Sequence, residues 1–129
     1  MGILLDTHGI LWGLMEPDKL GVVARARMED TEEEIWTSAV SLYEIAQKVR
    51  TGKLPYPDEL VRRFPQLLSE QGWKSLALSH RHAVQAGLYL CNHRDPFDRL
   101  LAAQAELEDL DLVTCDLSLG AFPVRCVWD

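Results

Sequence analysis

Four acidic residues of this sequence stand where the local pattern could give a carboxylate a chemical role. Asp6 follows the apolar residues 3–5, and Asp116 ends a similar apolar run. Such a run is typical of a strand that is buried on both faces and surfaces at its carboxyl end. Glu44 and Asp98 fall near the beginnings of two expected helices. Carboxylates that converge from separate elements are typical ligands of divalent cations.

The segment of residues 93–105 contains two aspartates with different expected roles. Asp95 precedes Pro96, and proline is favoured at the first helical position while Asp is a good N-cap. We therefore interpret Asp95 as a cap rather than a ligand. Asp98 would be the third helical residue, on the face that the helix buries, where an ionised carboxylate is costly unless it is paired or binds a metal. Its alternative role is to accept hydrogen bonds from first-turn N–H groups.

Glu44 lies in a helix that is expected to begin at Ser38 or Ser41 and to end at Arg50. The apolar residues of this helix recur at the spacing of one buried face. Glu44 lies beside that face rather than at its centre, so the pattern alone is also compatible with a solvated acid. The apolar residues in question are Leu42, Ile45, Ala46 and Val49.

Composition limits the class of protein. The chain has 129 residues, of which 47% are hydrophobic, and we expect a single domain over residues 1–129. Its net charge of −7 argues against broad electrostatic adhesion to nucleic acid or membrane. The three cysteines show no metal-binding or disulfide spacing, which suits a reducing compartment. With no apolar run of membrane-spanning length and no leader-like segment, we expect a cytoplasmic protein without a membrane partner.

Basic residues gather in one part of this acidic chain. Five of its 13 basic residues fall between positions 48 and 63. Such a cluster is a candidate surface for phosphate contacts, although solvated helix faces would produce the same pattern. The RNA-contact candidates are Lys48, Arg50, Lys53, Arg62 and Arg63.

Apolar runs and helical periodicities alternate along the chain, which predicts an α/β fold. We expect a central, mostly parallel sheet between two helix layers. Ligands of such sheets bind beyond the carboxyl ends of the strands, where the strand order reverses. The expected strands are residues 3–6, 35–37, 73–78, 110–116 and 124–128. The expected helices include one capped by Thr7, one near residues 20–29, one from Ser38 or Ser41 to Arg50, one from Asp58 to Leu68, one from Ser79 to Leu90, and one from Pro96 to Ala105.

The four acids favour one kind of chemistry if they meet. Carboxylates a few ångströms apart repel one another and raise one another's pKa, and a divalent cation relieves this repulsion. An all-oxygen site favours Mg²⁺ or Mn²⁺ over Zn²⁺. Such ions can bind a phosphodiester, activate water for attack and stabilise the departing oxygen. The pattern therefore indicates hydrolysis of a phosphate ester.

The sequence resembles the PIN-domain ribonucleases, in particular the VapC toxins of bacterial and archaeal toxin–antitoxin modules. Motifs as short as TxD are weak on their own, but LLDTH followed by HRDPFDRLLAAQA is highly specific. In order and spacing the matches extend over nearly the whole chain. They are residues 4–8 (LLDTH), 38–54 (SAVSLYEIAQKVRTGKL), 93–105 (HRDPFDRLLAAQA) and 113–116 (VTCD).

The resemblance implies a three-layer α/β/α fold and metal-dependent endonucleolytic cleavage of RNA. It implies Mg²⁺ or Mn²⁺ as cofactor, tRNA or rRNA as the substrate class, a cognate antitoxin protein as partner, and a homodimer. It assigns catalysis and metal binding to Asp6, Glu44, Asp98 and Asp116. Thr114 would orient an acid and Asp95 would be auxiliary, while Arg94 and Arg99 would flank the site and contact phosphate or position carboxylates.

Two alternative functions fit parts of the same pattern. A phosphotransfer domain also gathers acids around Mg²⁺, but the haloacid-dehalogenase type needs an acid two residues beyond Asp6, where this chain has His8. A receiver domain needs an acidic pair at the end of its first strand, which is also missing. The other alternative is a catalytically silent PIN-fold module that binds a protein. The complete set of four acids argues against that function.

Overall fold

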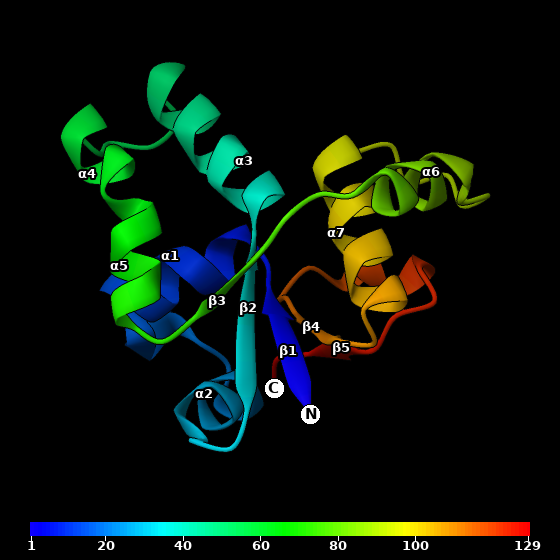
Figure 1. The fold of residues 1–129 in the computed structure, drawn as a ribbon, viewed down its shortest axis with the longest axis horizontal. Coiled ribbons are helices and arrows are strands. Elements are labelled where there is room, and N and C mark those ends of the chain that lie inside the picture. Colours follow the sequence, from blue (N-terminus) through cyan, green and yellow to red (C-terminus); the bar gives the residue numbers. More distant parts are fainter.

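The computed structural model describes residues 1–129, which form a five-stranded sheet whose strands are all parallel (Figure 1). The predicted α/β fold with a central, mostly parallel sheet is therefore confirmed. The strand order is β3-β2-β1-β4-β5. The strands are β1 (Gly2–Leu5), β2 (Glu34–Ser38), β3 (Lys74–Leu76), β4 (Asp111–Val113) and β5 (Cys126–Val127).

The strand order reverses between β1 and β4. From β1 the chain adds β2 and β3 on one side, and then returns to pair β4 with the free side of β1. The carboxyl ends of β1 and β4 therefore lie next to each other, with Leu5 paired to Val113. Asp6 directly follows the first of these strands, and Thr114 to Asp116 follow the second. This is the position where parallel sheets bind ligands.

Helices cover both faces of the sheet because successive strand residues point to opposite sides. In β1, Ile3 and Leu5 pack into one apolar core with residues of α1, α2 and α5, whereas Leu4 packs into a second core with residues of α7. Figure 1 shows these groups on either side of the sheet. The helices are α1 (Thr7–Met15), α2 (Val22–Glu29), α3 (Ala39–Arg50), α4 (Asp58–Arg62), α5 (Phe64–Glu70), α6 (His80–Leu88) and α7 (Pro96–Leu107), with the 3₁₀ turns η1 (Pro17–Lys19) and η2 (Leu117–Ala121).

Several predicted helix starts are confirmed by the capping hydrogen bonds. Ser38 caps α3, Ser79 caps α6 and Asp95 caps α7, each by accepting a hydrogen bond from a backbone N–H of the first turn. The predicted cap of α1 is wrong, because Asp6 rather than Thr7 is the N-cap residue. The carboxylate that ends β1 thus also begins the next helix.

Other boundaries differ from the prediction. The expected helix from residue 58 to 68 is two helices, α4 and α5, which meet at Arg63 just before Pro65. Pro65 has no N–H to donate to the carbonyl four residues earlier in a continuous helix, whereas in the first turn of α5 no such donor is needed, which explains a break there. Helix α6 ends at Leu88, and Leu90 is almost fully exposed rather than packed. The last two strands are shorter than expected.

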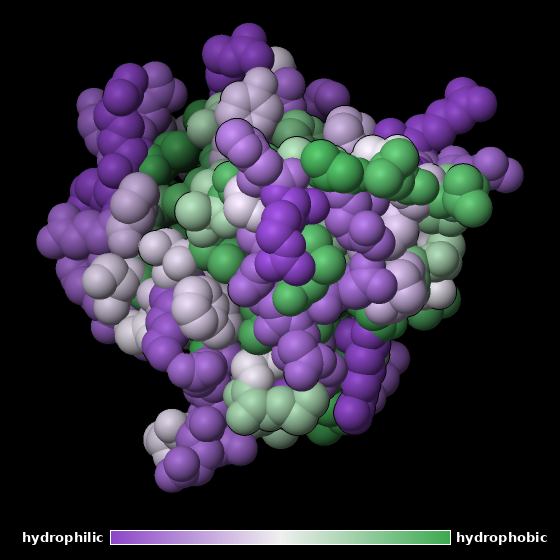
Figure 2. All heavy atoms as spheres, turned by 45° about the vertical axis from the view of Figure 1, so that its right-hand side comes forward, coloured by the Kyte–Doolittle hydropathy of each residue, from purple (hydrophilic) through white to green (hydrophobic).

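The surface combines polar groups with a few exposed apolar side chains. Figure 2 shows apolar side chains gathered near the upper right of a largely polar face. Large apolar residues that are exposed in and after α6 are Val84, Leu88 and Leu90. None of the helices is both long enough and apolar enough to cross a lipid bilayer.

Candidate active site

Asp6 is the most buried acid at the carboxyl end of the sheet. Its side chain is fixed as the N-cap of α1, where Oδ1 accepts a hydrogen bond of 2.7 Å from the backbone N–H of Gly9. The residue is 6% exposed. Burial raises the pKa of Asp6 above the ordinary value, and the nearby charge of Glu44 acts in the same direction, against hydrogen bonds from Thr114 and Gly9 that lower it. A positive charge at this position would therefore stabilise the ionised form.

Asp116 follows β4 in an exposed position with a different electrostatic environment. Its Oδ1 caps η2 and accepts hydrogen bonds of 2.9 Å from the Ser118 N–H and 2.7 Å from the Ser118 hydroxyl. These two hydrogen bonds lower the pKa of Asp116. The Thr114 hydroxyl in turn accepts a hydrogen bond of 3.1 Å from the backbone N–H of Asp116. Thr114 therefore contacts the carboxylate of Asp6 and the backbone of Asp116, the two acids that follow β1 and β4.

Asp98 lies in the first turn of α7 and is paired with a histidine. Its Oδ2 is 2.8 Å from Nε2 of His93, in side chains that are 21% and 13% exposed, respectively. Burial raises the pKa of Asp98, and the carboxylates of Asp95 and Asp116 also raise it, while His93 lowers it. Asp95 itself accepts a hydrogen bond of 2.9 Å from the Phe97 N–H, as expected of a cap.

Glu44 reaches the site from α3, on the other side of the sheet's carboxyl end. Its Oε1 accepts a hydrogen bond of 2.5 Å from the Thr7 hydroxyl, and its Oε2 lies 3.1 Å from Nζ of Lys48. Glu44 is 13% exposed in its side chain, so it is not the solvated acid that the helical pattern also allowed. These contacts aim its carboxylate toward the start of α1.

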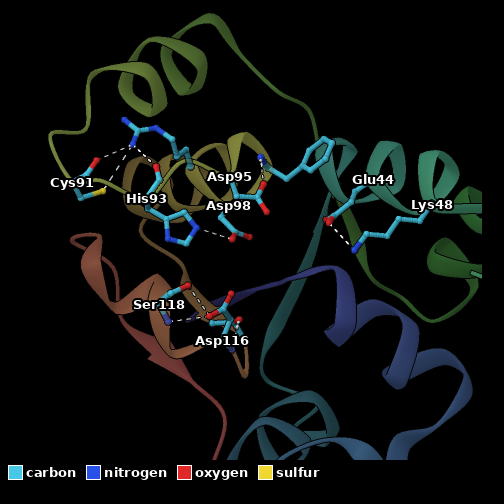
Figure 3. Close-up of polar contacts among 11 residues, drawn as sticks. Glu44, Lys48, Cys91, His93, Asp95, Asp98, Asp116 and Ser118 are labelled. Atoms are coloured by element: carbon cyan, nitrogen blue, oxygen red, sulfur yellow. Dashed lines mark hydrogen bonds and ion pairs between the residues drawn. The ribbon is translucent and has the colours of Figure 1, made fainter. Parts of the chain in front are cut away.

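One cavity brings the acids together. Its volume is about 310 Å³, and all four predicted catalytic carboxylates line it, together with Asp95 and Lys48. Figure 3 shows Asp98 and Asp95 at the start of α7, Asp116 facing them from the chain after β4, and Glu44 with Lys48 on α3. The remaining lining residues are Thr7, His8, Leu101, Cys115 and Leu119.

Neither of the two predicted arginines lines the acidic cavity. Arg99 is directed away from the cavity and donates hydrogen bonds to backbone carbonyl groups of the segment before α7. Arg94 is exposed and makes no hydrogen bond or ion pair with another residue. Among the basic cluster only Lys48 reaches the acidic cavity, while Arg50 and Arg62 line a separate shallow cavity between α3 and α4. Lys53 and Arg63 are exposed.

Three residues of the site were not among its predicted members, although Thr7 was expected to cap α1. His93 pairs with Asp98, Thr7 holds Glu44, and His8 lies at the cavity wall. Thr7 and His8 directly follow the acid at the end of β1, and His93 comes two residues before the cap of α7. Their positions beside a predicted strand and a predicted helix were the sign of a site role that the sequence offered. Their roles, however, depend on contacts with residues of other helices and strands.

The carboxylates that line the cavity are chemically suited to bind a hard divalent cation. Four carboxylates around one cavity provide oxygen ligands of the kind that Mg²⁺ and Mn²⁺ bind. In their present orientations no three acidic, histidine or cysteine side chains are close enough to share an ion. Asp98 and Asp116 each keep one carboxylate oxygen that is not hydrogen-bonded to another side chain, whereas both oxygens of Glu44 are engaged, by Thr7 and Lys48.

Comparison with known proteins agrees with the fold. The family model for the PIN domain matches residues 3–123. No curated protein sequence matches the chain significantly. Among solved structures, DNA-bound VapBC from Salmonella typhimurium aligns with a TM-score of 0.73 and 18% identity over 98% of this chain and 97% of that one. DNA-bound VapBC2 from Rickettsia felis aligns with a TM-score of 0.70 and 19% identity over 100% of both chains.

A third solved structure has the same fold. FitAcB from Neisseria gonorrhoeae aligns with a TM-score of 0.69 and 23% identity over 96% of this chain and 95% of that one. These similarities extend over whole chains of similar length, and the family model covers nearly all of the sequence. The chain belongs to the PIN domain family.

Proposed function

We propose that this protein is a VapC-type toxin that cleaves RNA with Mg²⁺ or Mn²⁺. The observation that carries the proposal is the cavity at the reversal point of the sheet, where Asp6, Glu44, Asp98 and Asp116 meet from four different segments. Placing carboxylates together costs free energy through their mutual repulsion. A PIN-domain chain that keeps this costly arrangement is best explained by the use of a cation.

The residues of the chain have distinct tasks in this function. A bound divalent ion would supply Lewis-acid activation of water and neutralise charge on the phosphate. Asp6 would provide a fixed oxygen, because the N-cap hydrogen bond holds its carboxylate in place. Asp98 and Asp116 would provide oxygens from the opposite wall, with Glu44 completing the set. Lys48 brings a positive charge to the cavity, where it can attract a phosphodiester.

The partner and substrate are part of the same proposal. Two of the structural neighbours are VapBC complexes, which supports a cognate antitoxin that blocks the cavity of this chain. We propose structured RNA, tRNA or rRNA, as the substrate, and a homodimer as the assembly. Basic side chains between positions 48 and 63 would contact the RNA backbone, Lys48 at the cavity and the others outside it. The candidates are Lys48, Arg50, Lys53, Arg62 and Arg63.

The decisive experiment compares Asp98→Asn with Asp109→Asn. Asp109 is an exposed residue after α7 with a positive φ of 56°, a conformation that Asn tolerates well. Each variant and the wild type would be induced briefly in cells, and RNA 5′ ends would be sequenced. We expect new 5′ ends with the wild type and with Asp109→Asn but not with Asp98→Asn. Equal cleavage by the folded Asp98→Asn protein would contradict the proposal.

Metal dependence is tested separately on purified protein. Protein stripped with EDTA should lose RNA cleavage and regain it when Mg²⁺ or Mn²⁺ is titrated back. Full activity in EDTA would exclude the metal-dependent function. A folded wild-type protein that binds an antitoxin but cleaves no RNA in either metal would instead favour the catalytically silent binding module.

A further inference from the structure

The backbone of the segment between α6 and α7 receives its hydrogen bonds from a single side chain. None of the backbone groups of residues 89–94 forms a hydrogen bond with another backbone group. A segment without such bonds depends on contacts made by side chains to keep one conformation. It nevertheless carries His93, whose imidazole is hydrogen-bonded to Asp98 at the wall of the acidic cavity.

Arg99 supplies the missing interactions. Its Nε donates to the carbonyl of Ala86 at 2.9 Å. Its Nη1 donates to the carbonyls of Cys91 at 3.2 Å and His93 at 2.8 Å. Its Nη2 donates to the carbonyl of Tyr89 at 2.6 Å. The guanidinium therefore binds the end of α6 and three residues of the segment at once.

Only a guanidinium can make this set of contacts. It is a rigid planar fork with five N–H donors, whereas the ammonium of lysine is a single point with three. The carbonyls at the end of α6 have no partner within the helix and gain one here. Arg99 also lies over the ring of Tyr89, with 6.0 Å from its Cζ to the ring centroid. The side chain is fully used by these contacts and is not directed at a substrate.

The contacts of Arg99 continue through His93 to Asp98 at the acidic cavity. Arg99 holds the backbone carbonyl of His93, the imidazole of His93 holds Asp98, and Asp98 precedes Arg99 on the first turns of α7. His93 also packs against Phe122, with 5.2 Å between the ring centroids. Figure 3 shows this path from the segment before α7 down to the carboxylate of Asp98.

We propose that Arg99 is a positioning residue for the acidic cavity. By fixing residues 86–93 it keeps His93 hydrogen-bonded to Asp98, and so keeps the Asp98 carboxylate oriented into the cavity. The effect on RNA cleavage rests on the proposed function, but the effect on His93 does not. Partners that orient metal-binding side chains typically contribute about 10- to 100-fold to activity or metal affinity.

The first test reads the imidazole of His93 directly. Long-range ¹H–¹⁵N spectra of the histidine rings would be recorded in EDTA at one pH for the wild type, Arg99→Met, Arg99→Lys and Arg81→Met. The His93 signals would be assigned with His93→Gln. Arg81 is an exposed arginine of α6 with no ion pair, so it is a matched control. We expect one fixed tautomer in the wild type and in Arg81→Met, and averaged tautomers in both Arg99 variants.

The second test measures RNA cleavage and its rescue. We expect Arg99→Met and Arg99→Lys to cleave about 10- to 100-fold more slowly than the wild type. Guanidinium added at millimolar concentration should partly restore Arg99→Met and leave Arg81→Met unchanged. Because Arg99 acts through His93, the Arg99→Met, His93→Gln double variant should be no slower than His93→Gln.

The outcomes separate this inference from the proposed function. Wild-type signals of His93 in a folded Arg99→Met or Arg99→Lys protein would overturn the positioning role, whatever the activity. A double variant in which the two losses multiply would also overturn it, because Arg99 would then act independently of His93. Absence of cleavage by the wild type would contradict the proposed function while the ring spectra still decide the role of Arg99.

Discussion

Thr7 donates a hydrogen bond of 2.5 Å to Glu44, although 37 positions separate them in the sequence. Thr7 begins α1, directly after β1, and Glu44 lies in the second turn of α3. The hydroxyl therefore joins the two helices that follow neighbouring strands, and it orients a carboxylate of the cavity. Lys48 binds the other oxygen of the same carboxylate. Glu44 is thus positioned by partners on two helices.

Replacing Thr7 with Val should expose the importance of this bond. The substitution keeps the shape of the side chain and removes the hydroxyl, so the partly buried Glu44 loses a donor. We expect the free energy of unfolding to fall by about 1–2 kcal/mol, as measured by urea denaturation. Thr7→Ser keeps the hydroxyl and should lose less. If Val and Ser were equally stable, the hydrogen bond would contribute nothing to the fold.

The ionised carboxylate of Asp6 is expected to destabilise the metal-free fold and to be needed for RNA cleavage. Burial raises its pKa, so the ionised carboxylate is unfavourable in the metal-free protein at neutral pH. Asn keeps the capping oxygen without the charge. We predict that Asp6→Asn in EDTA unfolds at a higher urea concentration than the wild type, but cleaves RNA at least about 100-fold more slowly.

Asp6→Ala is the control for the cap. It removes the charge and also the hydrogen bond to Gly9, and it should be about 1 kcal/mol less stable than Asp6→Asn. A metal-free Asp6→Asn protein that is less stable than the wild type would show that the ionised carboxylate stabilises the fold, contrary to its raised pKa.

The pH dependence of stability follows from the pKa shifts of the carboxyl groups in the cavity. The pKa values of Asp6 and Asp98 are raised in the folded protein, so the folded state binds these protons more tightly than the unfolded state. Their contribution to stability therefore increases as the pH falls from neutral through the folded pKa values. The pKa of Asp116 is lowered, so its contribution is present above the ordinary value of 3.8 and is lost only at lower pH.

Urea denaturation in EDTA from neutral pH down to about pH 4 tests this prediction. The double variant Asp6→Asn, Asp98→Asn should be more stable than the wild type at neutral pH. The difference should shrink as the pH falls and the two wild-type carboxyl groups become protonated. A difference that is constant across this range would mean that neither pKa is raised by folding.

The sequence was sufficient to predict the parts of the site that depend on local pattern. Apolar runs that end in acids located Asp6 and Asp116, and helix-capping rules distinguished Asp95 from Asp98. Ser38 and Ser79 were also recognisable as caps, because their types and positions satisfy first-turn N–H groups. These features depend on neighbours within a few residues, which is the range in which sequence patterns are informative.

Contacts between distant segments were not predictable in this way. The resemblance suggested that Arg99 contacts phosphate or positions carboxylates. Its observed contacts with the backbone of residues 86–93, however, depend on how the chain before α7 folds back over it. The same holds for the hydroxyl of Thr7, which the pattern suggested as a cap for α1 and which instead binds Glu44. Asp6 caps α1 in place of Thr7, because its carboxylate reaches further than the hydroxyl and its negative charge is favoured at a helix N-terminus.

Gln104 provides a last prediction about how the walls of the cavity are kept in place. It is fully buried in α7, and its Oε1 accepts a hydrogen bond of 2.5 Å from the hydroxyl of Ser38, the cap of α3. The pair joins the helix that carries Asp98 to the helix that carries Glu44. Because Leu cannot accept this bond, Gln104→Leu should lower the free energy of unfolding by about 1–3 kcal/mol.

A double-mutant cycle with Ser38→Ala separates this bond from the other effects of each substitution. Ser38→Ala alone also removes the cap of α3, which costs about 1 kcal/mol. If the two side chains interact, the double variant should be more stable than the sum of the single losses predicts, by at least about 0.5 kcal/mol. Additive losses in urea denaturation would mean that each side chain acts alone and that the two walls are held together by apolar packing.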